Sequence, residues 1–160
     1  QDIDTIRYLS VRRMLSASIK TLSRSFSTRQ KSAKMVVRHH VEGYESFLKF
    51  MDTFPKDNII HVLYSGTKLP DGNSWCSDCV EADPFIQKGL ESAPENSHFV
   101  YVEVGDRPFW KDLKCPFRTN TKTKLKVLPT LARWGTQKRL EGDQCLDVEL
   151  IEMLVTDEDD

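Results

Sequence analysis

The chain has 160 residues, of which 39% are hydrophobic and 29% are charged, and this composition suits one globular domain of ordinary size. No apolar run approaches the roughly 20 residues that a membrane-spanning helix needs, so we expect no membrane span. Residues 1–40 hold nine basic and two acidic residues, whereas the remainder holds 14 basic and 22 acidic ones. The acidic balance of the second part argues against nucleic-acid binding.

The first part of the chain has the composition of a leader. Serines are frequent and acidic residues are absent between Arg7 and Lys34, which is typical of a mitochondrial transit peptide. Apolar residues recur at helical spacings of three and four, opposite Arg13, Lys20 and Arg24. This apolar stripe consists of Tyr8, Val11, Leu15, Ile19, Leu22 and Phe26.

Two other interpretations of the leader stay open: a disordered tail, and upstream sequence that is not translated. Met14 and Met35 are both candidate initiators. We therefore leave residues 1–37 out of the fold and assign residues 38–160 to one domain. We expect its folded part to start near Val41.

Two patterns open this domain. Apolar residues at helical spacing predict an amphipathic helix that ends before Pro55; they are Tyr44, Phe47, Leu48 and Met51. Residues 58–65 (NIIHVLYS) form a nearly continuous apolar run, which predicts a central strand covered on both faces. His61 lies within this run, and we expect a hydrogen-bonded core histidine there rather than a catalytic one.

The remaining elements follow from local periodicity and β-propensity. In chain order they are a helix over residues 80–90, a strand over 98–104, a loop with a short helix over 106–126, a strand pair over 128–134 and 138–141, and a last helix from about residue 146. Their order predicts an α/β fold, with a central mixed β-sheet and helices on both faces.

Cysteine spacing narrows the chemistry. Four cysteines are too few for a disulfide scaffold in a chain of this length. A four-cysteine zinc site needs two close pairs, but Cys115 and Cys145 lie 30 residues apart and no histidine lies two to four residues from a cysteine. We therefore expect no metal site. The remaining pair, Cys76 and Cys79, is separated by two residues.

Cys76 and Cys79 can close a small disulfide ring across the first turn of the helix that follows them. There the first sulfur lies near unpaired backbone N–H groups and the positive end of the helix dipole, which favours the nucleophilic thiolate. The second sulfur lies about one turn later, within reach of a mixed disulfide on the first. A strand, a loop, Cys-x-x-Cys and a helix in this order form a thioredoxin-type redox signature.

Further stretches carry a resemblance to a known family. They are residues 65–68 (SGTK) with 74–79 (SWCSDC), 104–112 (VGDRPFWKD), 128–130 (LPT), and 144–146 with 152–154. On these residues the chain resembles the thioredoxin superfamily and, more narrowly, the thioredoxin domain-containing protein 17 family, from about Tyr44 onward. The long loop before the motif and the aspartate inside it separate this family from ordinary thioredoxins. The family usually has a proline where this chain has Ser77.

The resemblance implies roles by position. Cys76 is the attacking thiolate, Cys79 the resolving thiol, and Trp75 covers the site. Pro129 matches the family's cis-proline, which lies beside the redox-active disulfide and leaves a backbone edge for substrate pairing. Asp78 is the leading substitute for the buried acid of ordinary thioredoxins: it either carries the proton of Cys79 or only stabilises the first helical turn, by roughly 0.3–1 kcal/mol.

The other two cysteines are not expected to be catalytic. Cys145 has a counterpart in the family pattern and is expected to pack before the last helix. Cys115 lies in the basic loop, where we expect it to be exposed. For both, a free structural cysteine is favoured over a regulatory thiol.

The residues and the resemblance together predict a dithiol–disulfide oxidoreductase acting as a disulfide reductase. The resemblance implies no bound cofactor, electrons from NADPH through thioredoxin reductase, and small disulfides such as cystine, selected protein disulfides and peroxide as substrates. We expect a monomer in the cytoplasm, or in mitochondria if the leader is translated. The alternatives are a non-enzymatic thioredoxin-fold interaction module and a secretory oxidant; the missing apolar signal region argues against the latter.

Overall fold

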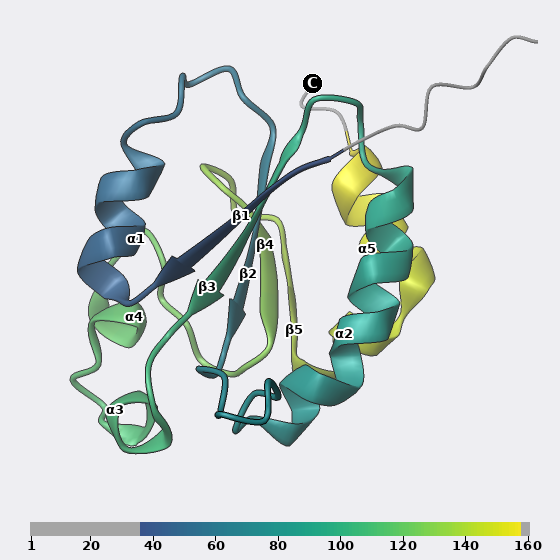
Figure 1. Cartoon of the computed structure of the whole chain (residues 1–160). Helices are drawn as coiled ribbons and strands as arrows, with labels where there is room; N and C mark the ends of the chain where they lie inside the picture. The colour runs from purple at the N-terminus through teal and green to yellow at the C-terminus, as the bar shows by residue number, and fades with distance from the viewer. Residues whose placement is uncertain (1–35, 158–160) are drawn as a thin grey trace, which may run out of the picture. The chain divides into compact units, whose positions relative to one another are not determined.

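A single mixed sheet organises the computed structural model, which describes residues 36–157. Its five strands lie in the order β1-β3-β2-β4-β5 (Figure 1). They are β1 (Val37–Glu42), β2 (Ile60–Ser65), β3 (His98–Glu103), β4 (Thr130–Arg133) and β5 (Arg139–Glu141). Strands β1, β3 and β2 run parallel, whereas β4 is antiparallel to β2 and β5 to β4. The predicted leader lies outside the described residues.

Helices cover both faces of this sheet, as the sequence predicts (Figure 1). One face carries α1 (Tyr44–Met51), α3 (Arg107–Lys111) and α4 (Pro116–Thr119), and the other carries α2 (Ser77–Gly89) and α5 (Val148–Thr156). Two short 3-10 turns, η2 (Leu90–Ser92) and η3 (Gly142–Leu146), precede β3 and α5. No helix in the described part of the chain is long and apolar enough to cross a bilayer.

Strand β2 is the predicted central strand, and all six of its residues are buried. Successive side chains of a strand point to opposite faces, so Val62 and Tyr64 pack with Phe47 of α1 while Leu63 packs with Ile86 of α2. An apolar residue is therefore required at almost every position. The apolar run in the sequence of β2 is therefore continuous, whereas a strand with one exposed face would alternate apolar and polar residues.

Strand β1 is absent from the predicted order of elements, and the expected start near Val41 is wrong. The strand pairs in parallel with β3 from Val37 opposite His98 to Glu42 opposite Glu103. Only Val41 of its six residues is buried, because β1 lies at the edge of the sheet. An edge strand with one buried side chain leaves no apolar alternation in the sequence.

The N-terminal turn of helix α2 carries the second half of the predicted Cys-x-x-Cys motif and lies near the C-terminal end of β2. The buried residues of α2 recur at spacings of three and four, and they are Cys79, Ala82, Ile86 and Gly89. A side chain at Gly89 would collide with Ile151 of α5, so the glycine permits close packing of the two helices. The same stripe that holds α2 against the sheet thus turns Cys79 inward.

Candidate active site

The two motif cysteines form a disulfide at the start of α2, with their Cα atoms 5.2 Å apart. Cys76 is the N-cap residue, and its Sγ accepts a hydrogen bond from the backbone N–H of Cys79 at 3.3 Å. N–H groups in the first turn have no partner within the helix, so the sulfur takes the place of the usual capping oxygen. The Cys76 and Cys79 residues are 8% and 6% exposed.

A hairpin-like loop, residues 66–75, places Trp75 directly before the two motif cysteines. Lys68 and Ser74 face each other across a β-bridge, and the Trp75 indole N–H donates to the carbonyl of Gly105 at 2.9 Å. A Cβ at Gly66 would lie 2.7 Å from the Trp75 ring and 3.0 Å from Cys76 Cβ. The indole is therefore held by one hydrogen bond to Gly105, outside the loop, and by one close contact with Gly66 that a larger residue would not allow.

Pro129 reaches the site from the start of β4. The Leu128–Pro129 bond is cis, which is the geometry that the family resemblance implies. The Pro129 carbonyl accepts a hydrogen bond from the N–H of Gly142 at 2.9 Å, and Thr130 then pairs with Tyr64 of β2. These contacts fix the proline at the end of β2, where it lines a cavity together with Cys79.

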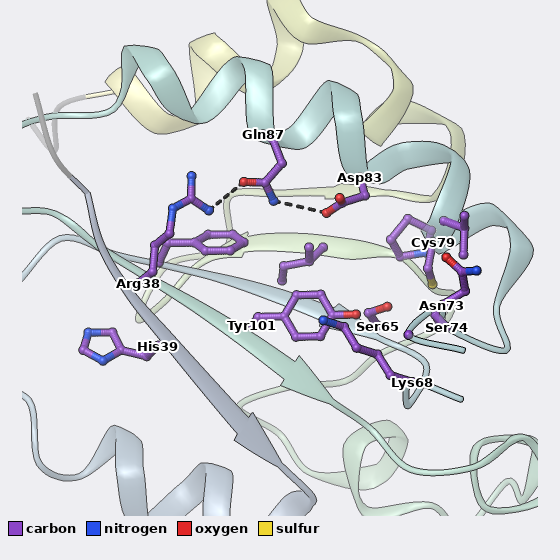
Figure 2. Close-up of a pocket in the computed structure, with 15 residues that line it drawn as sticks. Arg38, His39, Ser65, Lys68, Asn73, Ser74, Cys79, Asp83, Gln87 and Tyr101 are labelled. Carbon is purple, nitrogen blue, oxygen red and sulfur yellow. Dashed lines mark hydrogen bonds between the residues drawn. The ribbon is translucent and has the colours of Figure 1, made fainter. Parts of the chain in front are cut away.

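This cavity, which we call the Cys79 groove, has a volume of about 350 Å³. Its floor is formed by β2 and β3, its walls by α2 and the loop 66–75, and one end by β1 (Figure 2). Residues lining it include Arg38, Ser65, Lys68, Asp83, Gln87 and Tyr101. The volume is within the range of small-molecule sites.

Hydrogen bonds organise the α2 wall of the Cys79 groove. The Arg38 guanidinium donates to Oε1 of Gln87 at 2.6 Å, and Nε2 of Gln87 donates to Oδ1 of Asp83 at 3.1 Å (Figure 2). Arg38 also lies over the Phe99 ring, 5.4 Å from its centroid. A neutral amide thus links a cation at one end of the groove to a carboxylate nearer Cys79.

Tyr101 forms part of the groove floor. Burial, together with the nearby carboxylates of Glu103 and Asp83, raises the pKa of Tyr101, although a hydrogen bond with Ser65 acts in the opposite direction. The phenol therefore keeps its proton near neutral pH and can act as a hydrogen-bond donor in the groove.

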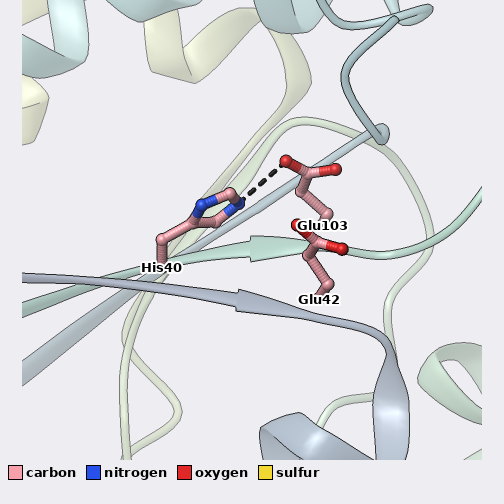
Figure 3. A group of neighbouring side chains, drawn as sticks. All are labelled: His40, Glu42 and Glu103. Carbon is pink, nitrogen blue, oxygen red and sulfur yellow. Dashed lines mark hydrogen bonds and ion pairs between the residues drawn. The ribbon is translucent and has the colours of Figure 1, made fainter.

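Beneath the loop 66–75, the carboxylate of Glu103 contacts both β1 and the backbone of the loop. Its Oε1 pairs with Nε2 of His40 at 2.8 Å (Figure 3), and its Oε2 accepts the backbone N–H of Lys68 at 3.1 Å. The ligand atoms of His40, Glu42 and Glu103 lie within 4.8 Å of one another. Both oxygens of Glu103 are thus engaged, and this buried carboxylate holds the backbone of the loop at Lys68.

Asp78, the predicted proton carrier, lies on the exposed side of α2. Its carboxylate accepts a hydrogen bond from the hydroxyl of Ser77 at 3.3 Å, and it is not among the residues that line the Cys79 groove. Asp83 does line the groove, one helical turn after Cys79. The i, i+4 spacing from Cys79 is the sequence signal that identifies Asp83. The proton-transfer role of Asp78 stays a prediction.

Both free cysteines are buried. The expected exposure of Cys115 is wrong: it is 2% exposed, because helix α4 turns Cys115 and Phe117 into the core beside Leu125. Cys145 packs in η3 before α5, as predicted, and burial raises its pKa to about 11.

His61 is a core residue, but the expected hydrogen bonding is wrong. The residue is fully buried, and neither ring nitrogen has a hydrogen-bond partner of ordinary geometry among the described residues. Burial and the facing Arg133 lower its pKa to about 4, an effect that the backbone of Leu154 offsets in part. His61 lies at the start of β2, whereas the motif follows the end of that strand.

Comparisons with known proteins agree with this geometry. The thioredoxin domain of the thioredoxin domain-containing protein 17-like family matches residues 40–157. Thioredoxin domain-containing protein 17 of Danio rerio is 40% identical over 118 residues, and that of Homo sapiens 36% over 118; each alignment covers 74% of this chain and 94% of the relative. Thioredoxin-like protein Clot of Arabidopsis thaliana is 38% identical over 97 residues, covering 58% of this chain and 72% of the relative.

The mixed sheet flanked by helices, with Cys-x-x-Cys at the start of α2 and a cis-proline before β4, defines a thioredoxin-like domain. Within that class, the chain belongs to the thioredoxin domain-containing protein 17-like family. The recognition and the fold class predicted from the sequence are thereby confirmed.

Proposed function

We propose that the protein is a dithiol–disulfide oxidoreductase that reduces disulfides. The observation that carries the proposal is the placement of Cys76 and Cys79 across the first turn of α2, where a backbone N–H points at the sulfur of Cys76. An N–H donor and the positive end of a helix stabilise a thiolate. The family supports a redox role for this pair.

The reaction begins with the reduced dithiol. The Cys76 thiolate attacks one sulfur of the substrate disulfide, so that a mixed disulfide forms and the other substrate sulfur leaves as a thiolate. Cys79 then loses its proton and attacks Sγ of Cys76, which releases the second substrate thiolate. The protein ends as the Cys76–Cys79 disulfide, and two electrons have passed to the substrate.

In this proposal the cycle closes with electrons from NADPH through thioredoxin reductase, and the protein carries no bound cofactor of its own. Small disulfides such as cystine, selected protein disulfides and peroxide are the proposed oxidants, and the cytoplasm the proposed compartment. Trp75 and the loop 66–75 cover one side of the dithiol, which supports a narrower range of substrates than an uncovered site would accept.

The test is a reductase-coupled assay that follows NADPH oxidation with cystine and with a protein disulfide. Cys76→Ser should abolish turnover, and Cys79→Ser should accumulate a mixed disulfide with substrate, visible by mass spectrometry. Cys115→Ala is the matched control, because it removes a thiol that is buried outside the proposed site. Normal turnover by Cys76→Ser would disprove the assignment, and folded wild-type protein without turnover would favour the interaction module.

A further inference from the structure

Lys68 places a positive charge over the Cys79 groove. Its ammonium lies 5.0 Å from the centroid of the Tyr101 ring, and Figure 2 shows the side chain extending along that ring. Across the described part of the chain, no carboxylate forms an ion pair with Lys68. Among residues 36–157 the charge is therefore held against an aromatic face and has no carboxylate as an ion-pair partner.

The side chain of Lys68 is exposed, but two contacts fix its backbone. Its N–H donates to the buried carboxylate of Glu103 at 3.1 Å, and the residue faces Ser74 across the β-bridge of the loop. Ser74 Oγ in turn accepts the backbone N–H of Cys76 at 3.1 Å. The cation is thus connected through one short loop to the N-cap of α2.

Neither of the other two charged residues that line the groove, Asp83 and Arg38, forms an ion pair with Lys68. Asp83 accepts a hydrogen bond from Gln87 on the opposite wall, and Arg38 adds a second cation at the far end. A carboxylate that enters the groove beside Cys79 would therefore meet the Lys68 ammonium, which lines the same cavity. An exposed ion pair of this kind changes a binding constant by up to about fivefold.

We propose that Lys68 determines substrate specificity by binding a carboxylate carried by the disulfide substrate, so that the protein reduces anionic disulfides in preference to neutral or cationic ones. This inference rests on the proposed reductase function. The reacting bonds are unchanged: Cys76 attacks the substrate disulfide, Cys79 resolves the mixed disulfide, and two substrate thiolates leave. Lys68 contributes only to the position and retention of the substrate.

The experiment uses the full chain, reduced with dithiothreitol and desalted, in single-turnover oxidation followed by stopped-flow tryptophan fluorescence. The probes are 3,3′-dithiodipropionate, 2-hydroxyethyl disulfide and cystamine, which carry two negative charges, none and two positive charges. The readout is the ratio of the anionic to the neutral rate constant. Comparing this ratio between variants cancels the intrinsic reactivity of each probe.

Lys68→Met should lower that ratio about threefold, the size expected for one exposed ion pair, and Lys68→Arg should retain it. Raising the salt concentration to about 0.5 M should lower the wild-type ratio in the same direction. Lys56→Met, which removes an exposed lysine outside the groove, should leave the ratio unchanged.

The contrary outcomes are distinct. If none of the probes oxidises the wild-type protein, the reductase proposal fails and this inference with it. If all three oxidise it and Lys68→Met keeps the wild-type ratio, the function stands and the role of Lys68 is refuted. An equal loss of rate with all three probes would also refute it, because a merely structural lysine does not discriminate by substrate charge.

Discussion

Acidification should destabilise the protein through His61, and the structure gives the sign and size of this effect. The pKa of His61 falls from its ordinary 6.5 to about 4, first because the ring is buried and second because it faces Arg133. Between these two values the unfolded chain binds a proton that the folded chain does not. Stability from this group is therefore complete above the unfolded pKa and is lost progressively as the pH falls from 6.5 toward 4.

The magnitude follows from the difference between the two pKa values. The limiting loss is about 3 kcal/mol, since each unit corresponds to roughly 1.4 kcal/mol. Between pH 7.5 and pH 5, where the unfolded histidine is almost fully protonated and the folded one is not, linkage gives a loss of about 2 kcal/mol. That is a large share of the total stability of a small domain.

The assay is urea denaturation at these two pH values, with the Cys76–Cys79 disulfide intact. His61→Leu removes the titrating group and fills the site with an apolar side chain, so its free energy of unfolding should change less between the two pH values, by about 2 kcal/mol. His40→Gln, at a half-exposed histidine, reports the contribution of other groups. Equal pH dependence in wild type and His61→Leu would refute the reasoning.

Two further predictions concern the active site. Gly66→Ala forces a Cβ against Trp75 and Cys76. It should lower the free energy of unfolding by about 1–3 kcal/mol in denaturation experiments and lower kcat/KM with cystine about tenfold or more. Unchanged activity would show that the close approach has no function. Asp78→Asn removes a negative charge next to the dithiol, so it should raise the thiolate fraction of reduced Cys76 and speed its alkylation by iodoacetamide near pH 6 about two- to fivefold. An unchanged alkylation rate would leave Asp78 as a helix-stabilising residue alone.

Most of the fold could be predicted from the sequence because its elements carry local signals. Burial leaves a pattern within the sequence of each element. It is a continuous apolar run in β2, alternation in β3, and apolar stripes at helical spacing in α1, α2 and α5. Strand β1 could not be predicted, because β3, the strand with which it pairs, lies about 60 residues away along the chain and its own outward residues are polar. Similarly, the basic composition of the segment around Cys115 gave no sign that α4 buries it.

The positions of the candidate site residues were predictable to the extent that these residues are adjacent in sequence. Trp75, Cys76 and Cys79 follow from one motif, and Pro129 follows from the family resemblance. Lys68, by contrast, comes to lie over Tyr101 only because β2 and β3 run parallel and end at the same edge of the sheet. A contact between segments that are far apart in the sequence leaves no local pattern from which it could be predicted.

The loop 66–75 has a tip and a base that are held by separate hydrogen bonds. Its tip closes on itself, since Leu69 N–H donates to Asn73 at 2.7 Å and Gly72 N–H to Leu69 at 2.8 Å, while its base is held by Glu103 and Gly105. The tip residues Gly72 and Asn73 line the groove, whereas the base is hydrogen-bonded to Glu103 and Gly105. Substitutions at the tip should therefore change one wall of the groove while the base of the loop keeps its hydrogen bonds.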